Sequence, residues 1–445
     1  MTAPLSPRDA VQRILHAIQV QPPLRVPLAD ALGSVLAEPI TSPLDIPAWT
    51  NSAMDGYAAR AEDVRGASAE RPLQLQVIEQ IPAGSFPSRT IGPGECARIF
   101  TGAPLPEGAD TVVRQEDTDY GAKTVTITND RDAGVNIRLA GEDIRKGAQV
   151  LAAGDELTPA RLGVLASLAV AAPLVHRRPR VAILGSGDEI VDIDQPEEIL
   201  SGRKVASSNT HTLAALIRMT GGVPVNLGIA RDTPESLRAH LELAFACDLL
   251  VTTAGISVGE HDYLRSVLES MGMELGFWKL KMRPGAPVGF GMLAQGEGRR
   301  EKGEVTARAG DPASRVSLPT ARLPWIGLPG NPVSTMVTFE LFVRPTIRKM
   351  MGHRLPFRRT VPVSLAEPVK VGATLQHFLR AVVTPTDDGR HSARLTGPQG
   401  SGILTSMILA NALLIIPEGQ PETAAGAIAS ALLLDDPHHL ADPPY

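Results

Sequence analysis

The most informative stretch of this 445-residue chain is VAILGSGDEI, residues 181–190. An apolar run from Val181 to Leu184 is followed at once by small residues and two carboxylates. A short apolar run bounded by glycine predicts a buried strand, and small residues after it let backbone N–H groups approach an anion. The stretch therefore predicts a strand that ends in a ligand-binding turn.

The same alternation of apolar runs and helical patterns continues to about residue 350. It predicts further strands at 223–229, 248–253, 274–282 and 323–327, and helices at 209–219, from 233, at 261–271 and at 332–350. Strands that alternate with helices are typical of a mostly parallel sheet covered on both faces. We therefore predict a central three-layer α/β domain over residues 179–352. Residues 294–322, rich in charge and glycine and without periodicity, are predicted to be a mobile surface insertion in it.

Smaller parts are predicted on either side of this domain. Residues 46–143 form a β-rich domain, with strands at 73–81, 96–100, 110–116 and 124–128 between glycine turns. Residues 353–445 form a C-terminal β domain with a flexible tail. Helices are predicted at 7–18, 28–36 and 159–169, and residues 1–45 and 144–178 are predicted to form one discontinuous helical and extended domain. The fold class is therefore multidomain α/β plus β.

The composition limits the classes of function. A formal net charge of −5 excludes a nucleic-acid binder that works by bulk positive charge. Two distant cysteines, Cys96 and Cys247, exclude a disulfide framework and a four-thiolate zinc site. No signal peptide is recognised, and the longest apolar run, residues 162–175, contains Pro173 and is too short to span a bilayer. We expect a cytoplasmic protein with neither nucleic acid nor membrane as a partner.

Glycine-bearing turns follow the predicted strands at residues 185–189, 252–259 and 327–332. Ligands of open α/β sheets bind outside the carboxyl ends of the strands, where these turns converge. Any one glycine turn is more often structural. The convergence of all of them on one edge favours an anion-binding site.

Charged residues gather at the same edge. The carboxylates are Asp188, Glu189, Asp232, Glu260 and Asp262. They are either solvated surface acids or ligands of a hard cation that bridges to an anionic substrate, as Mg²⁺ does. On a strand, Lys279, Lys281 and Arg283 would share one face, which is either a solvated edge or a surface for an anionic ligand.

Several segments together resemble the molybdopterin molybdenumtransferase family, which includes the E domain of gephyrin. The matching segments are Asp45-Ile46-Pro47 with residues 51–58, residues 101–106, residues 141–144, Gly187-Asp188-Glu189, residues 257–263 and residues 328–334. They occur in family order, and the resemblance extends from residue 6 to about residue 420.

The resemblance implies a four-domain homodimer that inserts molybdenum from molybdate into adenylylated molybdopterin and releases AMP, with Mg²⁺ as cofactor and molybdate as co-substrate. Residues 1–45 and 144–178 would then serve as linker and dimerisation domain, and residues 179–352 as the molybdopterin-binding domain. The adenylylating enzyme and recipient molybdoenzymes are implied as further partners.

Carried over by motif position, the functional residues fall into three groups. The catalytic residues are Asp55, Thr101, Asp143, Glu189, Asp232, Asp262 and Lys279. The substrate-binding residues are Gly255, Ser257, Gly259, Arg283, Pro329, Pro332, Arg380 and Ser401. The metal ligands are Glu189, Asp232 and Asp262.

The chain departs from the family pattern in its basic segment and in one loop. The usual Lys-Pro-Gly-Lys-Pro is Arg283-Pro284-Gly285-Ala286-Pro287 here, and Ala254 stands where glycine is common. Two alternatives stay open at this point: a diverged paralogue that adenylylates molybdopterin, and a molybdopterin carrier or scaffold without activity. The β domains on both sides of residues 179–352 argue against the first.

Overall fold

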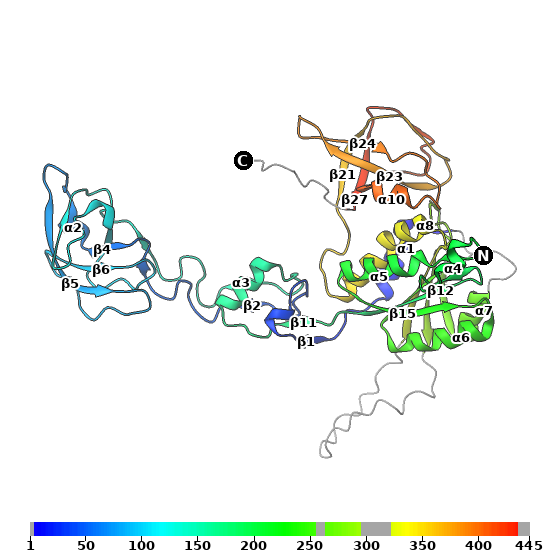
Figure 1. Ribbon diagram of the computed structural model, residues 1–445, viewed down its shortest axis with the longest axis horizontal. Coiled ribbons are helices and arrows are strands. Elements are labelled where there is room, and N and C mark those ends of the chain that lie inside the picture. The colour runs from blue at the N-terminus through cyan, green and yellow to red at the C-terminus, as the bar shows by residue number, and fades with distance from the viewer. Residues whose placement is uncertain (1–3, 255–262, 295–321, 435–445) are drawn as a thin grey trace, which may run out of the picture. The chain divides into compact units, whose positions relative to one another are not determined.

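The computed structural model describes residues 4–254, 263–294 and 322–434 (Figure 1). The chain divides into a larger unit, residues 1–26, 30–37 and 174–445, and a smaller unit, residues 27–29 and 38–173. The predicted insertion at 294–322, apart from its two end residues, and the predicted flexible tail from residue 435 lie outside the described residues.

A mixed sheet forms the centre of the larger unit, with strand order β15-β12-β16-β20-β19-β17. Its strands are β12 (Arg180–Ser186), β15 (Val223–Ala230), β16 (Leu249–Thr253), β17 (Met273–Phe277), β19 (Gly289–Ala294) and β20 (Arg322–Leu328). Strands β15, β12, β16 and β20 are parallel, whereas β19 runs antiparallel to both of its neighbours. The prediction of a mostly parallel sheet is confirmed.

Helices cover both faces of this sheet (Figure 1). They are α1 (Pro7–Ala17), α5 (Ser208–Thr220), α6 (Pro234–Leu243), α7 (Tyr263–Ser270) and α8 (Pro332–Thr338). Val181 and Ile183 of β12 pack with α1, α5 and α8, and the alternate residues Ala182 and Leu184 pack with α6 and α7. Alternate side chains of a strand point to opposite faces, so these two clusters confirm the three layers.

The helix predicted at 332–350 is continuous but not regular. It consists of α8, a π-helical turn η5 (Phe339–Val343) and α9 (Arg344–Met350). Pro345 cannot donate a backbone hydrogen bond, and its ring would crowd the carbonyl one turn earlier. The wider π turn lies directly before this proline and accommodates it.

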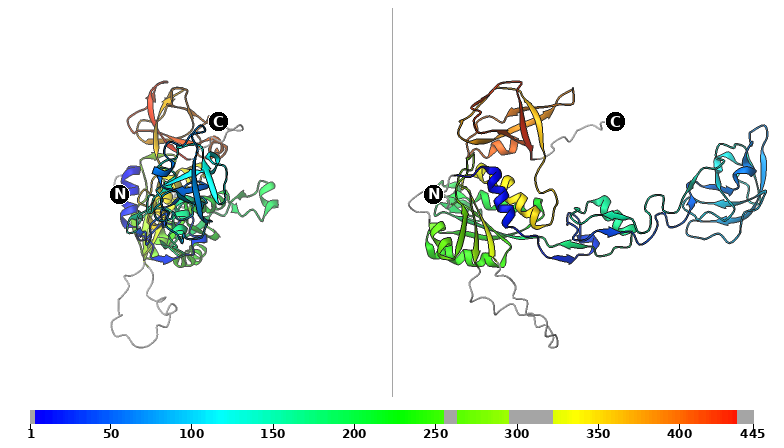
Figure 2. Two further views of the ribbon diagram at one scale, coloured as in Figure 1. Left: turned by 90° about the vertical axis from the view of Figure 1, so that its left-hand side faces the viewer. Right: turned by 180° about the vertical axis from the view of Figure 1, so that it is seen from behind.

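The C-terminal strands close into a small barrel (Figure 2). Its strands are β21 (Thr360–Leu365), β23 (Gln376–Pro385), β24 (His391–Leu395), β25 (Ala412–Ile416) and β27 (Ile428–Leu433). They run in the order β23-β24-β21-β27-β25, and β25 pairs back onto β23. Helix α10 (Thr405–Leu409) and the antiparallel pair of β22 (Val369–Lys370) with β26 (Glu422–Thr423) complete this part.

Two predicted elements are wrong. The strand expected at 274–282 is divided: β17 ends at Phe277, and β18 (Met282–Arg283) pairs with β23 of the barrel instead. The helix expected at 28–36 is a 3-10 turn, η1 (Leu28–Asp30), followed by extended chain. Gly33 has a φ of +71°, which a helix does not allow, and Leu36 bridges to Val175.

Short elements complete the larger unit. They are β1 (Pro23–Arg25), β11 (Leu174–His176), β13 (Ile190–Val191), α4 (Pro196–Leu200), β14 (Val205–Ala206) and η3 (Ala244–Ala246). Strand β1 pairs with β11, and β13 pairs with β14. At the N-terminus, the Ser6 hydroxyl accepts a hydrogen bond from Asp9 N–H and Pro7 occupies the first turn of α1, as the sequence predicts.

The smaller unit is built on a sheet with strand order β7-β4-β6-β5-β8. Its strands are β4 (Gly56–Ala59), β5 (Leu73–Ile81), β6 (Glu95–Ile99), β7 (Thr111–Arg114) and β8 (Thr124–Ile127). Short elements accompany it: β2 (Ile40–Thr41), β3 (Asn51–Ser52), α2 (Ala61–Val64), η2 (Gln115–Asp117), β9 (Ile137–Arg138), β10 (Gln149–Leu151) and α3 (Pro159–Ser167). The strands predicted within 46–143 and the helix at 159–169 are confirmed.

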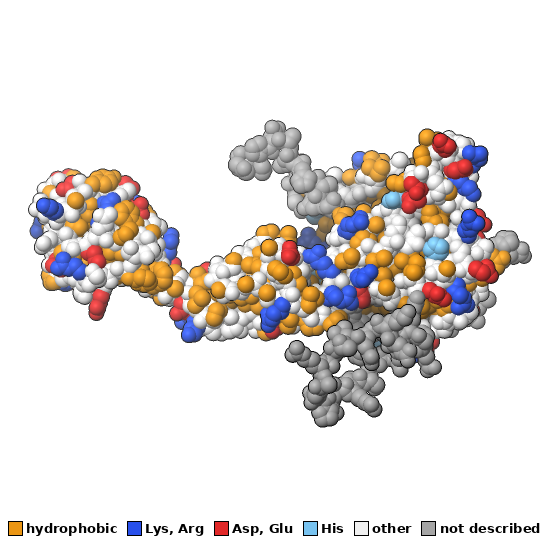
Figure 3. Space-filling view, turned by 60° about the horizontal axis from the view of Figure 1, so that its bottom comes forward, with side chains coloured by type: hydrophobic (Ala, Val, Ile, Leu, Met, Phe, Trp, Pro, Cys, Tyr) orange, Lys and Arg blue, Asp and Glu red, His pale blue; other side chains and the backbone are white. Residues whose placement is uncertain are grey.

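The surface carries charges of both signs. Lys and Arg side chains are interspersed with Asp and Glu side chains on the face shown in Figure 3. No helix among the described residues is both long enough and apolar enough to cross a lipid bilayer.

Candidate functional site

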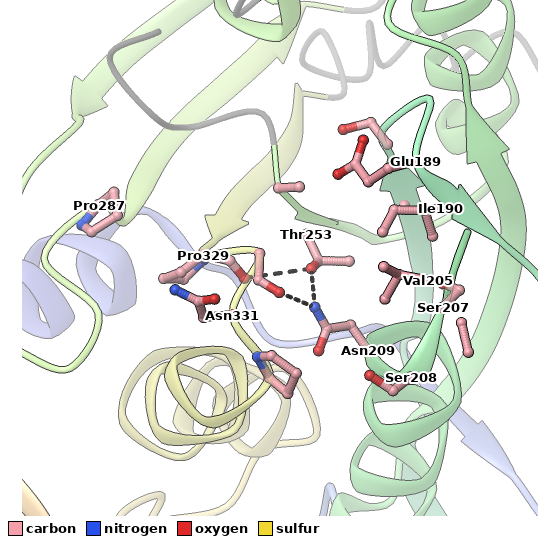
Figure 4. A pocket seen from close by; sticks show the side chains of 16 residues that line it. Glu189, Ile190, Val205, Ser207, Ser208, Asn209, Thr253, Pro287, Pro329 and Asn331 are labelled. Atoms are coloured by element: carbon pink, nitrogen blue, oxygen red, sulfur yellow. Dashed lines mark hydrogen bonds between the residues drawn. The ribbon is translucent and has the colours of Figure 1, made fainter. Parts of the chain in front are cut away.

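A cavity of about 490 Å³ opens at the carboxyl ends of β12, β16 and β20. The turns after these strands line it, together with the first residues of α5 and α8 (Figure 4). Three of the predicted site residues, Glu189, Pro329 and Pro332, are in its wall. The convergence of the glycine turns expected from the sequence is therefore observed for the first and the last of them.

Asn209 joins the loops around the cavity. Its side-chain amide donates to Thr253 Oγ1 at 2.8 Å and to the Gly330 carbonyl at 2.7 Å (Figure 4). Thr253 Oγ1 donates in turn to the Pro329 carbonyl at 3.4 Å. The start of α5 and the ends of β16 and β20 are thus held together by one side chain. Sequence reasoning missed Asn209, because an asparagine in a first helical turn is commonly explained by capping.

Ala254 lies in the same wall in a strained backbone conformation. Its φ of +72° is in the left-handed region, which an alanine rarely adopts. A Cβ atom placed on Gly330 would lie 3.3 Å from Ala254 Cβ, so the two loops approach each other closely. A glycine at position 254 would adopt this conformation without strain.

The carboxylates at this edge form no complete metal site in the part of the chain that the structure describes. Glu189 lines the cavity, and its carboxylate folds back over Gly187. Asp188 Oδ1 accepts a hydrogen bond from Asp232 N–H at 3.3 Å, which brings Asp232 to the same edge. Asp262, and with it Gly255, Ser257 and Gly259, lies outside the described residues.

The basic segment adjoins the cavity through Pro287, which is part of its wall. Lys279 and Arg283 are exposed. Leu280 and Met282, which lie between them in the sequence, are buried. The predicted alternation of exposed cations and buried apolar residues is therefore present, although the single strand is not. Lys281 forms an exposed ion pair at 3.3 Å with Glu418, in the segment that follows β25.

Arg380 is entirely buried in strand β23, with 0% exposure. Its Nε donates to Ser406 Oγ at 3.1 Å and its Nη2 to the Gly400 carbonyl at 3.0 Å. Nη1 has no hydrogen-bond partner within residues 4–254, 263–294 and 322–434, and no carboxylate there pairs with the guanidinium. Burial lowers the pKa of Arg380 below its usual range, as expected for a charge removed from water without a counter-ion.

Ser401 connects Arg380 to the cavity. The Ser401 carbonyl accepts a hydrogen bond from Val333 N–H at 3.1 Å, and Val333 directly follows Pro332 in the cavity wall. The preceding carbonyl, that of Gly400, is the one bound by Arg380. The structure thus brings four predicted residues, Pro329, Pro332, Arg380 and Ser401, into one connected region of the larger unit.

In the smaller unit, Asp55 and Thr101 form a hydrogen-bonded pair. The Thr101 N–H and hydroxyl both donate to Asp55 Oδ1, at 2.8 and 2.7 Å. These bonds, with a smaller contribution from the charge of Arg98, lower the pKa of Asp55. The Asp143 N–H donates to the Ile46 carbonyl at 3.1 Å.

Three family models match the chain. They are described as "MoeA N-terminal region (domain I and II)", over residues 5–169, "Probable molybdopterin binding domain", over 182–349, and "MoeA C-terminal region (domain IV)", over 362–434. Together they span most of the sequence in order.

Similar proteins cover nearly the whole chain. A molybdopterin molybdenumtransferase of Nostoc sp. is 36% identical over 90% of this chain and 86% of its own. Molybdopterin molybdenumtransferase 2 of Mycobacterium tuberculosis is 36% identical over 91% of this chain and 93% of its own. The crystal structure of the molybdopterin biosynthesis moeA protein of Pyrococcus horikoshii has a TM-score of 0.75 at 27% identity, covering 96% and 99% of the two chains.

Proposed function

The chain belongs to the molybdopterin molybdenumtransferase family, and on that premise we propose how its residues take part in the transfer of molybdenum to molybdopterin. It is an enzyme of molybdenum cofactor biosynthesis, a transferase that inserts molybdenum into molybdopterin. The observation that carries this conclusion is similarity over nine tenths of the chain. Similarity of that extent favours the transferase over the adenylylating paralogue and over a carrier without activity.

The test is a direct assay of the reaction. Purified protein is incubated with adenylylated molybdopterin and molybdate, and the AMP released is measured. We expect release that depends on molybdate, together with a product that activates a molybdenum-free recipient enzyme. Formation of adenylylated molybdopterin from ATP, without molybdate-dependent AMP release, would instead identify an adenylyltransferase.

The substrate is a pterin dithiolene joined to AMP through a pyrophosphate, and molybdate is a second anion. Exposed Lys279 and Arg283 supply positive charge next to the cavity, and Arg283 offers the forked geometry that binds phosphate oxygens. A buried guanidinium without a carboxylate partner is costly unless an anion occupies its free side. We therefore assign Arg380, with Ser401, to oxyanion binding.

The carboxylates at the cavity edge suit a magnesium site that the substrate phosphates complete. Mg²⁺ is commonly held by one or two carboxylates together with substrate phosphates and waters. Glu189 and Asp232 supply such carboxylates, and Asp262 is the third ligand that the family resemblance implies. When bound, the ion would neutralise charge on the pyrophosphate. Loss of AMP release in a chelator, with recovery on adding Mg²⁺, is the expected result.

Asp55 and Thr101 are assigned to the substrate as well. The Thr101 hydrogen bonds keep the Asp55 carboxylate ionised and fix its orientation, so it can accept hydrogen bonds or hold a proton donor in place. Asp143 is retained as a functional residue on the family resemblance alone.

We propose further that the protein acts as a cytoplasmic homodimer that receives its substrate from the adenylylating enzyme and passes the product to molybdoenzymes. The proposed domains are 1–45 with 144–178 for dimerisation, 46–143, 179–352 and 353–445. In support, the sheet of the smaller unit lies within 46–143 and the mixed sheet of the larger unit within 179–352. Light scattering of the purified protein tests the dimer, and a monomer at working concentration would contradict it.

A further inference from the structure

Two aromatic residues of the smaller unit remain exposed beside the Asp55–Thr101 pair. Trp49 and Phe86 are 40% and 66% exposed. Their rings meet edge to face, with 5.0 Å between centroids and 67° between planes. Large aromatic rings gain most from burial in cores and interfaces. A pair left in solvent, and fixed by mutual contact, is a surface suited to another flat group.

Hydrogen bonds of the Trp49 and Asp55 side chains to one turn place the indole near the carboxylate. Trp49 Nε1 donates to the Gly102 carbonyl at 3.4 Å, and Gly102 directly follows Thr101, which binds Asp55. The flanking segments are tied together as well, since Gly102 N–H donates to the Ser52 carbonyl at 2.8 Å. The indole and the carboxylate are therefore anchored to adjacent residues of one turn, Gly102 and Thr101.

The chemistry of the neighbouring groups indicates what kind of flat ring fits. Asp55 Oδ1 is occupied by Thr101, whereas Oδ2 accepts no hydrogen bond from any described residue. The Arg98 guanidinium stacks on the rings of Tyr57 and Phe100, at 4.7 and 5.6 Å, and adds positive charge near the carboxylate. An ionised carboxylate is an acceptor only, so it selects a ring edge that carries N–H donors.

Of the two ring systems in the substrate, the pterin has that edge. Its amino group and the adjacent ring N–H are both donors, whereas adenine places a ring-nitrogen acceptor beside its amino group. We propose that Trp49 and Phe86 form a stacking subsite for the pterin ring of the substrate, and that Asp55 accepts hydrogen bonds from its amino edge. This subsite rests on the proposed function, because the pterin enters through the substrate of the family.

The first experiment measures the Michaelis constant for adenylylated molybdopterin in the full-length protein. Trp49→Ala and Phe86→Ala should each raise KM about ten- to hundredfold, the range of a lost stacking contact, with kcat changed less than about twofold. Trp49→Phe keeps a ring and should recover most of the affinity. Phe357→Ala is the matched control, since Phe357 is an exposed phenylalanine of the larger unit. An unchanged KM in both alanine variants would overturn the subsite.

The second experiment identifies the ring and separates this inference from the proposed function. Calorimetric titration with 6-hydroxymethylpterin should show weaker binding to both alanine variants, and titration with AMP should not. Loss of AMP affinity instead would assign the rings to adenine and overturn the pterin assignment. A change of oligomeric state without a change in either affinity would make the rings a protein interface. Ring-dependent pterin binding in a protein that releases no AMP would support the subsite while refuting the proposed function.

Discussion

Replacement of Arg380 by methionine tests whether this buried cation serves the fold or a ligand. Methionine approximates the volume of the arginine stem and removes the charge. Because Arg380 has 0% exposure and pairs with no described carboxylate, the folded protein carries the desolvation penalty of an isolated guanidinium. A residue kept for stability alone would not be placed in this way.

The magnitude follows from the contacts. The substitution removes the hydrogen bonds to Ser406 and to the Gly400 carbonyl, which together contribute about 3–6 kcal/mol because the donor is charged. It also removes a desolvation penalty of several kcal/mol for one buried ion. Because these two contributions are similar in size and opposite in sign, we expect the stability of Arg380→Met to lie within about 2 kcal/mol of the wild type. For a unit of this size that corresponds to a change in Tm of about 3 °C at most.

The assay is thermal unfolding with and without molybdate. A ligand present at a hundred times its Kd stabilises the folded state by about 2.7 kcal/mol. The wild type should therefore gain about 4 °C in Tm, whereas Arg380→Met should gain nothing and should release no AMP. Arg380→Lys keeps the charge without the fork and should show an intermediate shift.

Two outcomes would refute the reasoning. A loss of about 3–5 kcal/mol in Arg380→Met without any anion would mean that the guanidinium is a structural partner in the folded protein. An equal molybdate shift in wild type and variant would mean that the anion binds elsewhere.

Three further predictions concern other residues. Thr101→Val removes one of the hydrogen bonds that lower the Asp55 pKa, so this pKa should rise and the acid limb of the rate profile should move to higher pH; an unmoved limb would exclude Asp55 as the titrating group. Burial, with the charges of Arg348 and Arg344, lowers the pKa of His353 to about 4. The unfolded chain binds this proton below about pH 6.5, so stability should fall by on the order of 3 kcal/mol between pH 6.5 and 4, and His353→Asn should flatten that slope in urea unfolding at successive pH values. Asn209→Ala removes both hydrogen bonds that tie α5 to the strand ends, and should cost about 1–3 kcal/mol in chemical unfolding and lower AMP release; full activity would show that the loops keep their place without it.

The strands were predictable wherever an apolar run ends at a glycine or a turn. Strand β5 begins and ends at the predicted residues, 73 and 81, and β12, β16 and β20 follow the same rule. The hydrophobic pattern does not specify which neighbouring strand each segment pairs with. Residues 274–282 have the period of a strand throughout, yet β17 pairs within the mixed sheet and β18 pairs with the barrel. That division is decided by tertiary packing.

The candidate site was predictable in part for a similar reason. Glu189, Pro329 and Pro332 follow from the rule that ligands bind at the carboxyl ends of parallel strands. Arg380 came only from family resemblance, although its position within the apolar run from Phe378 to Val383 is a signal of a buried charge. Asn209 carries no such signal, because its role depends on two loops that are distant in sequence.

Strands β19 and β20 stay paired up to Ala294 and Arg322, so the connection between these two residues can accept additional sequence. Ala294 and Arg322 are direct partners across an antiparallel ladder, so their Cα atoms are separated by about the distance that a two-residue turn spans. The pairing of the two strands therefore does not depend on the number of residues between Ala294 and Arg322. Replacing residues 295–321 by a short turn would recover only about 2 kcal/mol of loop-closure entropy, since that entropy grows as the logarithm of length. Segments of different length, including an inserted reporter domain, can thus be placed here while the strands that shape the cavity keep their register.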